Sequence, residues 1–467
     1  MTLLHLRPGG GESFSGGGGH DGGGSGGGGA IFELIFYLIQ LIFYYPTIAI
    51  PLLIAAIAYF AWSAHQRHQN RDWDSGPPAT LEAALELDEL RARDPDFSQV
   101  VFEDFAFRLF AAAQRARPDQ LAGVAPYVSQ AARDELAARE PANAKIEQVI
   151  VGAQRVVRFE IDDATDGRVR VGVEYEANVA TAGHTYYSVE TWLYARDAQR
   201  RSKPPGAARD FPCPNCGAPW QASATGTQTC ASCGQVVDNG RFDWIVEHIS
   251  LASLDERAPT LTAAVPERGT DLPTYRQADL ARRLAALSAD DPAFAEPQVI
   301  ARLRMIYDEL NRTWAVNELA PVRGLVSDGL YDYLTYWTSA YARQGLRNVL
   351  ADMRITKTAI AKLERDRWYD ALTIRLWGTG KDYVIRSDTG RVVRGSVHLE
   401  RAYSEYWTLI RSAARKGPAK TDATCANCGA PLKVGMAGAC DHCGAHVTGG
   451  EFDWVVSKIE QDDTYRG

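Results

Sequence analysis

Hydrophobic and polar positions divide the chain into a polar start, one long apolar run and a large remainder with alternating patterns. Residues 30–62 are almost entirely apolar and include one acidic and no basic residue. As one continuous helix this run would extend for about 50 Å, which exceeds the roughly 30 Å of a bilayer's hydrocarbon core. Pro46 and Pro51 are where such a helix would kink or break. The pattern predicts one transmembrane helix centred on residues 44–62, with a short re-entrant hairpin as the alternative.

The large remainder carries the same order of patterns twice. Asp-Pro-Asp-Phe at residues 94–97 and Asp-Pro-Ala-Phe at residues 291–294 each precede apolar residues at helical spacing. Strict alternation of apolar and polar residues follows in each copy, and it predicts strands. Each copy then closes with a glutamate two residues before a tryptophan: Glu190 and Trp192, Glu405 and Trp407. Helices followed by antiparallel strands predict an α+β domain, and the duplication predicts two of them in tandem.

These patterns give a predicted order of segments along the chain. A glycine-rich tail comes first, and it cannot bury an apolar core. Proline-rich, charged stretches separate the later segments. The predicted order is a disordered tail (1–29), a transmembrane segment (30–64), a first α+β domain (94–200), a cysteine-rich module (211–250), a linker (251–289), a second α+β domain (290–416) and a second cysteine-rich module (423–460).

All eight cysteines lie in the two cysteine-rich modules. Each module has two C-x2-C pairs, separated by thirteen residues in the first module and eleven in the second. Two such pairs can complete a tetrahedral four-sulfur zinc site, which leaves no open coordination position and is therefore structural. Disulfides or a redox C-x-x-C are the alternatives, but a redox motif is usually a single pair beside a βαβ pattern. Each module is therefore predicted to be a zinc ribbon. The predicted ligands of the two zinc ions are Cys213, Cys216, Cys230 and Cys233, and Cys425, Cys428, Cys440 and Cys443.

Both modules end with Phe-Asp-Trp, which places Phe242 and Trp244 in the first module and Phe452 and Trp454 in the second. These side chains are too large to stay exposed in such small modules. We expect them to pack on the module's own core or on the neighbouring domain. The segments that follow each tryptophan fit either a strand or a helix.

The charge distribution bears on the class of partner and on the cellular location that the sequence predicts. A net charge of −8 disfavours a general nucleic-acid-binding protein. Arg67 and Arg71 follow the apolar run, and the positive-inside rule then places the C-terminal bulk in the cytoplasm. Cysteines kept as metal-binding thiolates agree with a reducing compartment. These features predict a single-pass protein of the inner, cytoplasmic membrane with its C-terminal domains in the cytoplasm.

The second copy resembles the Tim-forty-four-like domain family. The resemblance covers residues 290–415 and is most specific where DYVIRSDTGRVVRGS is followed by EYWTLIRS. The first copy lacks the D-T-G-x-V-V-x-G run and keeps the helix pattern and Glu190-Thr-Trp192. The resemblance implies cone-shaped α+β domains of the nuclear-transport-factor-two type and a membrane-apposed scaffold rather than an enzyme. The family's role in holding a chaperone at a mitochondrial translocase is not carried over to this chain.

Motifs for catalysis are absent from the sequence, which contains no H-E-x-x-H and no G-x-S-x-G. Asp382, Tyr383, His398 and Tyr403 could project from the second sheet, but alternating strand residues are usually core or solvated. A run of aromatic residues at helical spacing is expected to be core, with a surface role as the alternative: Tyr331, Tyr333, Tyr336, Trp337 and Tyr341.

The function predicted from these features is a membrane-anchored, non-catalytic scaffold or adaptor with two structural zinc ions. Its tandem domains would bind protein partners or lipid headgroups, in membrane-associated protein transport or assembly. No catalytic residue and no nucleic-acid partner is expected. The alternative is binding or conversion of a small hydrophobic molecule in the pocket of a cone domain.

Overall fold

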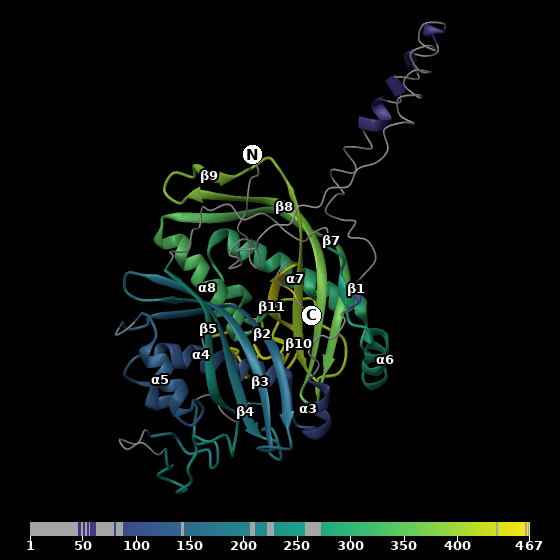
Figure 1. Ribbon diagram of the computed structural model, residues 1–467. Helices are drawn as coiled ribbons and strands as arrows, with labels where there is room; N and C mark the ends of the chain where they lie inside the picture. The colour runs from purple at the N-terminus through teal and green to yellow at the C-terminus, as the bar shows by residue number, and fades with distance from the viewer. Residues whose placement is uncertain are drawn as a thin grey trace. The chain divides into compact units, whose positions relative to one another are not determined.

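The structure is a computed structural model (Figure 1). It describes residues 45–47, 50–51, 54–55, 57–61, 79–80, 87–141, 144–205, 211–221, 228–256, 272–435, 438–462, 465 and 467. A large compact unit contains Pro78–Gly269 and Thr274–Gly467, and a smaller unit contains Ser15–Pro77 and Thr270–Pro273.

The predicted membrane anchor is contradicted. A spanning helix needs about 20 consecutive apolar residues, and no helix within the described ranges is both long and apolar enough to cross a membrane. Most of the predicted segment 30–64 lies outside the described residues. The prediction of a single-pass protein of the cytoplasmic membrane, with the orientation inferred from Arg67 and Arg71, is therefore wrong.

The first half of the large unit begins with helices and ends with a four-stranded sheet. Ser98 caps one of the helices, because its hydroxyl accepts a hydrogen bond from the Val101 backbone N–H. All four strands pair antiparallel in the order β2-β3-β4-β5. The elements are α3 (Asp88–Arg93), α4 (Gln99–Arg115), a 3-10 turn η1 (Leu121–Val124), α5 (Gln130–Ala138), β2 (Gln148–Asp162), β3 (Arg168–Ala180), β4 (Thr185–Asp197) and β5 (Ile245–Glu256).

The second half repeats this order. Ser327 caps the third helix as Ser98 does above, and Asn317 ends the second helix in the left-handed conformation, with a φ of 62°. The sheet order is β11-β10-β8-β7, with β9 paired to β8. The elements are α6 (Leu280–Asp290), α7 (Glu296–Val316), a 3-10 turn η2 (Ala320–Val322), α8 (Asp328–Arg343), β7 (Leu346–Arg365), β8 (Tyr369–Arg386), β9 (Val392–Gly395), β10 (Arg401–Ser412) and β11 (Val455–Gln461).

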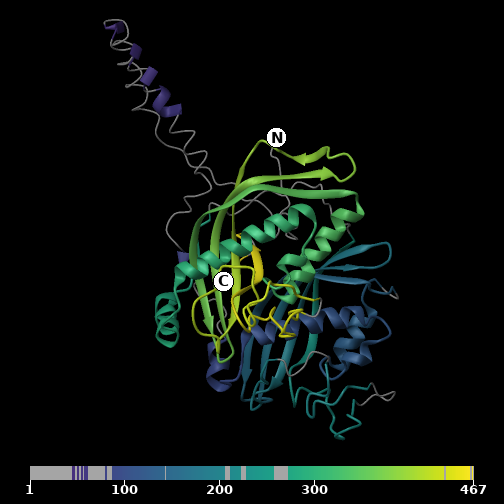
Figure 2. The same cartoon turned by 180° about the vertical axis from the view of Figure 1, so that it is seen from behind.

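Each half has its own apolar core between its helices and one face of its sheet. Figure 2 shows α7 lying across the sheet of the second half. The predicted mixture of helices and antiparallel sheets is thus confirmed. A short parallel pair, β1 (Ala79–Thr80) with β6 (Tyr275–Arg276), lies outside both sheets.

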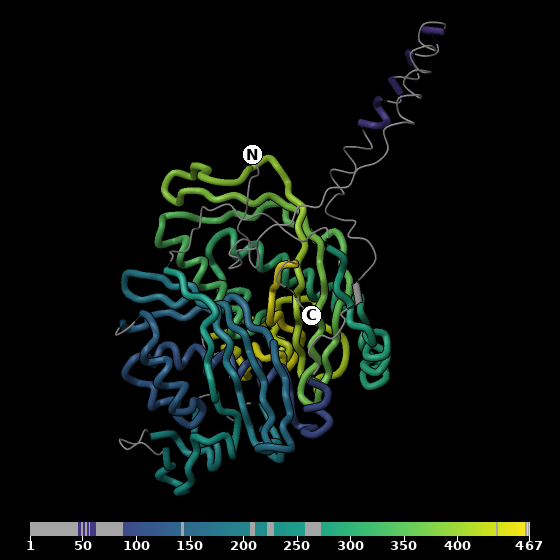
Figure 3. Tube along the Cα trace, in the orientation of Figure 1, coloured from purple at the N-terminus to yellow at the C-terminus, as the bar shows by residue number. Residues whose placement is uncertain are grey.

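Each cysteine-rich module connects two paired strands. The first module runs from β4 to β5, and the second from β10 to β11 (Figure 3). The segments after Trp244 and Trp454, which the sequence left open between strand and helix, are strands that extend the sheets.

Strand β8 is buried along almost its whole length. Leu372 and Ile374 face the helices of their own half and belong to its core. Thr373 points to the opposite face, where it lines a cavity together with α4 of the first half. The two halves therefore cover both sides of this strand.

Candidate metal centres and the cavity between the halves

The four sulfur atoms of the first module lie together, all within 4.8 Å of one another. The Sγ atoms of Cys213 and Cys233 are 3.9 Å apart, and those of Cys216 and Cys230 are 3.8 Å apart. A tetrahedral ion with metal–sulfur bonds of about 2.3 Å would place its sulfurs about 3.8 Å apart, whereas a disulfide needs about 2.05 Å. The sulfurs are thus spaced for a shared ion, and all eight cysteines are free.

The second module has the same geometry. Its four sulfurs also lie within 4.8 Å of one another, with 4.0 Å between the Sγ atoms of Cys425 and Cys443. The backbone turns alike after the first cysteine of each module, because Gly217 and Gly429 donate backbone hydrogen bonds to Cys213 and Cys425. Both glycines have positive φ, 75° and 74°. This conformation explains why a glycine follows the C-x2-C pair.

Hydrogen bonds to sulfur favour a thiolate at one cysteine of each site, Cys233 in the first and Cys443 in the second. The Asn215 side-chain amide and the Gln235 N–H lower the pKa of Cys233 to about 6. Burial, in contrast, raises the pKa of Cys213 to about 12. A divalent cation would hold all four sulfurs deprotonated, since a coordinating thiol loses its proton. Each set of four predicted ligands could therefore hold one metal ion and is compatible with zinc.

His446 lies beside the second site but has other partners. Its Nδ1 is 2.6 Å from Glu451 Oε1, and its Nε2 is 3.7 Å from Asp328 Oδ2. The nearby carboxylates of Asp328 and Glu451 raise its pKa to about 9. His446 thus links the module to the first turn of α8.

The Phe-Asp-Trp ends join each module to its domain. Phe242 and Phe452 pack on the cysteine clusters of their modules. Trp244 and Trp454 instead enter the cores of the first and second halves. In each module, the phenylalanine therefore packs on the module's own core, and the tryptophan packs on the neighbouring domain.

In the second half, Arg302 of α7 holds both ends of the module. Its Nε donates to the backbone oxygen of Trp454 at 2.9 Å, and its Nη1 donates to that of Lys420 at 3.0 Å. The Asp453 carboxylate lies 3.5 Å from Arg302, and both side chains are buried. No local pattern predicted these contacts, because Arg302 lies in an ordinary helical pattern.

The residues considered for a pocket in the second domain are not brought into one site. Asp382 is buried and accepts a hydrogen bond at 2.6 Å from Asn348, which in turn accepts one from Trp314. Tyr403 is buried and bonds to Tyr307, while His398 is exposed. The aromatic run on α8 is buried except for the half-buried Tyr333, so it forms core rather than a surface.

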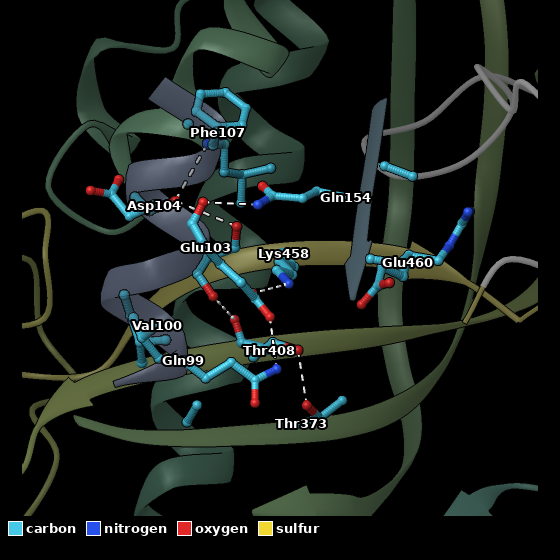
Figure 4. Close-up of a pocket in the computed structure, with 18 of the residues that line it drawn as sticks. Gln99, Val100, Glu103, Asp104, Phe107, Gln154, Thr373, Thr408, Lys458 and Glu460 are labelled. Carbon is cyan, nitrogen blue, oxygen red and sulfur yellow. Dashed lines mark hydrogen bonds and ion pairs between the residues drawn. The ribbon is translucent and has the colours of Figure 1, made fainter. Parts of the chain in front are cut away.

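A cavity with a volume of about 440 Å³ lies between the halves (Figure 4). Helix α4 forms one wall, with Gln99, Glu103 and Phe107. The outer face of the second sheet forms the opposite wall. Strands β2 and β11, each at the edge of its sheet, close the sides.

An ion pair crosses this cavity from one half to the other. Lys458 Nζ on β11 lies 2.5 Å from Glu103 Oε2 on α4, and Gln99 donates to Glu103 at 2.8 Å. Burial on its own would raise the pKa of Glu103, but the positive charge of Lys458 outweighs this effect and lowers it. Burial raises the pKa of Glu460, which lines the same cavity. The residues of this site come from distant parts of the chain, so no local sequence pattern predicted it.

Comparison with known proteins gives one family. No curated protein matches the chain. Residues 280–421 match the family model described as the Tim44-like domain, which confirms the resemblance inferred from residues 290–415.

Proposed function

We propose that this protein is a non-catalytic scaffold that binds protein partners through two tandem cone-shaped domains of the nuclear-transport-factor-two type. The observation that carries the proposal is the match of residues 280–421 to the Tim44-like domain. Its process would be protein transport or assembly. A structural zinc ion would lie in each cysteine-rich module.

The first half supports a second domain of the same type. Its helices and strands follow the same order as those of the second half. The Glu-x-Trp pairs also agree in detail, because Trp192 Nε1 donates to Glu190 at 2.9 Å and Trp407 Nε1 donates to Glu405 at 2.8 Å. Two domains in one chain would let a scaffold hold two partners at once.

Two features favour a role without catalysis. Four cysteines around each ion would leave no coordination position for a substrate. Several buried charges of the second half are engaged in ion pairs within the fold, such as Arg375 with Asp462 at 2.9 Å. The cavity of about 440 Å³ lies between the halves and not between the helices and the sheet of one domain, so it is not the cone pocket that the alternative requires.

The proposal can be tested by measuring how the amount of the complex of two partners depends on the amount of this chain. Partners would first be identified by crosslinking to the full chain in native extracts, and the complex of two partners would then be measured as expression of the chain rises. A scaffold in excess divides its partners among incomplete complexes, so the amount of full complex should rise and then fall. A rise to a steady plateau would contradict a scaffold. The Trp407→Ala chain, matched in expression, is the control for a poorly folded second domain.

A further inference from the structure

We propose that the cavity between the two halves binds a small organic anion, whose phosphate or carboxylate group lies on a row of four side chains across the second sheet. The row consists of Lys362, Thr373, Thr408 and Lys458, one from each of four neighbouring strands. This binding site is independent of the scaffold function proposed above.

Strand register brings the row together. Lys362 pairs with Thr373, Thr373 with Thr408, and Thr408 with Lys458, so all four side chains share one face of the sheet. Adjacent strands lie about 4.8 Å apart, which separates the two lysine Cα atoms by about 14 Å. A lysine side chain reaches roughly 6 Å on its four-carbon stem. The two ammonium groups can therefore approach one oxyanion seated over the threonines.

The side chains of the row carry hydrogen-bond donors for a bound anion. An ammonium group carries three N–H donors. Among the described contacts, Lys458 donates to Glu103, and Lys362 lies 3.3 Å from Glu364 Oε1. Between them, the hydroxyls of Thr373 and Thr408 are 2.9 Å apart and bonded to each other. Two ammonium groups on either side of a hydroxyl pair suit a compact oxyanion.

Three acidic residues of the cavity walls are compensated by basic partners, and burial raises the pKa of the other two, Asp366 and Glu460. Besides the pair of Lys458 with Glu103, ion pairs join Asp104 to Arg108 and Glu364 to Arg91, at 2.9 and 3.0 Å. Glu460 lies two residues from Lys458 on β11, and burial favours its neutral carboxyl form. A neutral carboxyl group repels a bound anion less than a carboxylate does.

The size of the cavity indicates more than a bare ion. A volume of about 440 Å³ lies within the usual range for small-molecule sites, about 300 to 1,000 Å³. A ligand that fills it carries an organic part beside its oxyanion. Because α4 and β2 of the first half complete the walls, a single Tim44-like domain would lack this site.

Calorimetric titration of the full chain tests the proposal, with inorganic phosphate and acetate as probes. We expect saturable binding of one ion per chain. Phosphate should bind more tightly than acetate if the natural ligand is a phosphate ester, and acetate should bind more tightly if it is a carboxylate. Lys362→Met and Lys458→Met should each weaken binding about tenfold, because each removes a charged hydrogen-bond donor. The matched control is Lys357→Met, also on β7, whose ammonium lies over the Trp377 ring outside the cavity and whose loss should leave affinity unchanged.

Two further variants guard against a folding defect. Lys458→Met leaves Glu103 without its partner, so the double change Lys458→Met with Glu103→Gln keeps the cavity free of an uncompensated charge. Thr373→Val with Thr408→Val preserves shape and should weaken binding several-fold. The proposal is overturned if neither anion binds saturably to the wild type. Equal affinity in the Lys362→Met and Lys357→Met chains would overturn it as well.

Discussion

The guanidinium carbon of Arg411 lies 4.6 Å from the centroid of the Trp454 ring. The same side chain forms ion pairs with Asp291 at 3.1 Å and with Asp370 at 3.2 Å, and all of these residues are buried. Asp291 opens the Asp-Pro-Ala-Phe motif, and Trp454 closes the second cysteine-rich module. One arginine on β10 therefore ties the start of the domain to the end of its module.

The first half repeats this relationship. Arg196 lies 4.6 Å over the ring of Trp244 and 2.8 Å from Asp94, which opens Asp-Pro-Asp-Phe. The recurrence of both motifs in the sequence thus has one physical cause, since an arginine on the strand before each module needs both a carboxylate and an aromatic face.

Replacing Arg411 by methionine should destabilise the second half by about 3–5 kcal/mol, because it leaves the buried Asp291 without its cation and removes one of the two arginines that pair with the buried Asp370. Urea denaturation of the full chain, followed by tryptophan fluorescence, would measure the change. Arg386→Met is the matched control, since its ion pair with Asp388 is exposed and should contribute less than about 1 kcal/mol. A similar loss in both variants would refute the proposed role of Arg411.

The sequence predicted the aspartate and the tryptophan of this arrangement but not the arginine that contacts both. Repeated motifs identified Asp94, Asp291 and the module tryptophans, because short patterns carry local information. The arginine partners could not be identified, since Arg196 and Arg411 lie 102 and 120 residues from their aspartates and meet them only in the fold. For the same reason, the strand character of the residues after Trp454 became visible only through their pairing with β10.

Metal analysis of the full chain should find two zinc ions, and one after Cys428→Ser. Because the second module connects β10 to β11, loss of its metal should also loosen β11, so amide hydrogens of residues 455–461 should exchange faster. Strands β7 and β8 should keep their protection, because they form the long hairpin of the sheet.

Cys216→Ser provides the matched control for the metal prediction. It should remove the other ion and accelerate exchange in β5 instead of β11, because the first module connects β4 to β5. Zinc well below two ions per wild-type chain, or unchanged exchange in β11 after Cys428→Ser, would contradict the prediction.

Trp407→Ala should destabilise the second half by about 3–5 kcal/mol. Trp407 is 2% exposed within the core, and its indole N–H donates to the buried Glu405. Trp407→Phe retains most of the apolar volume, so thermal unfolding of the two variants separates the loss of packing from the loss of the hydrogen bond. Equal melting temperatures for the alanine variant and the wild type would show that this position is not part of the core.

The roles of buried polar residues were harder to infer from the sequence. Alternation on β8 suggested that Asp382 was structural or solvated, and its hydrogen bond to Asn348 makes it structural. The cavity between the halves had no local signal, because Lys362 and Lys458 meet only through the register of four strands. Register of this kind is set by the whole sheet.

The pKa of His446 gives the last prediction. The carboxylates of Asp328 and Glu451 raise it to about 9, above the value of about 6.5 for an unfolded chain. Protonated His446 therefore stabilises the fold fully below about pH 6.5, and this stabilisation is lost as the pH rises through 9. Asp328→Asn and Glu451→Gln each remove one of the two causes, so each should lower the pKa toward 6.5. NMR titration of the His446 ring in the full chain measures both values, and a wild-type pKa near 6.5 would show that the link between the second module and α8 does not form.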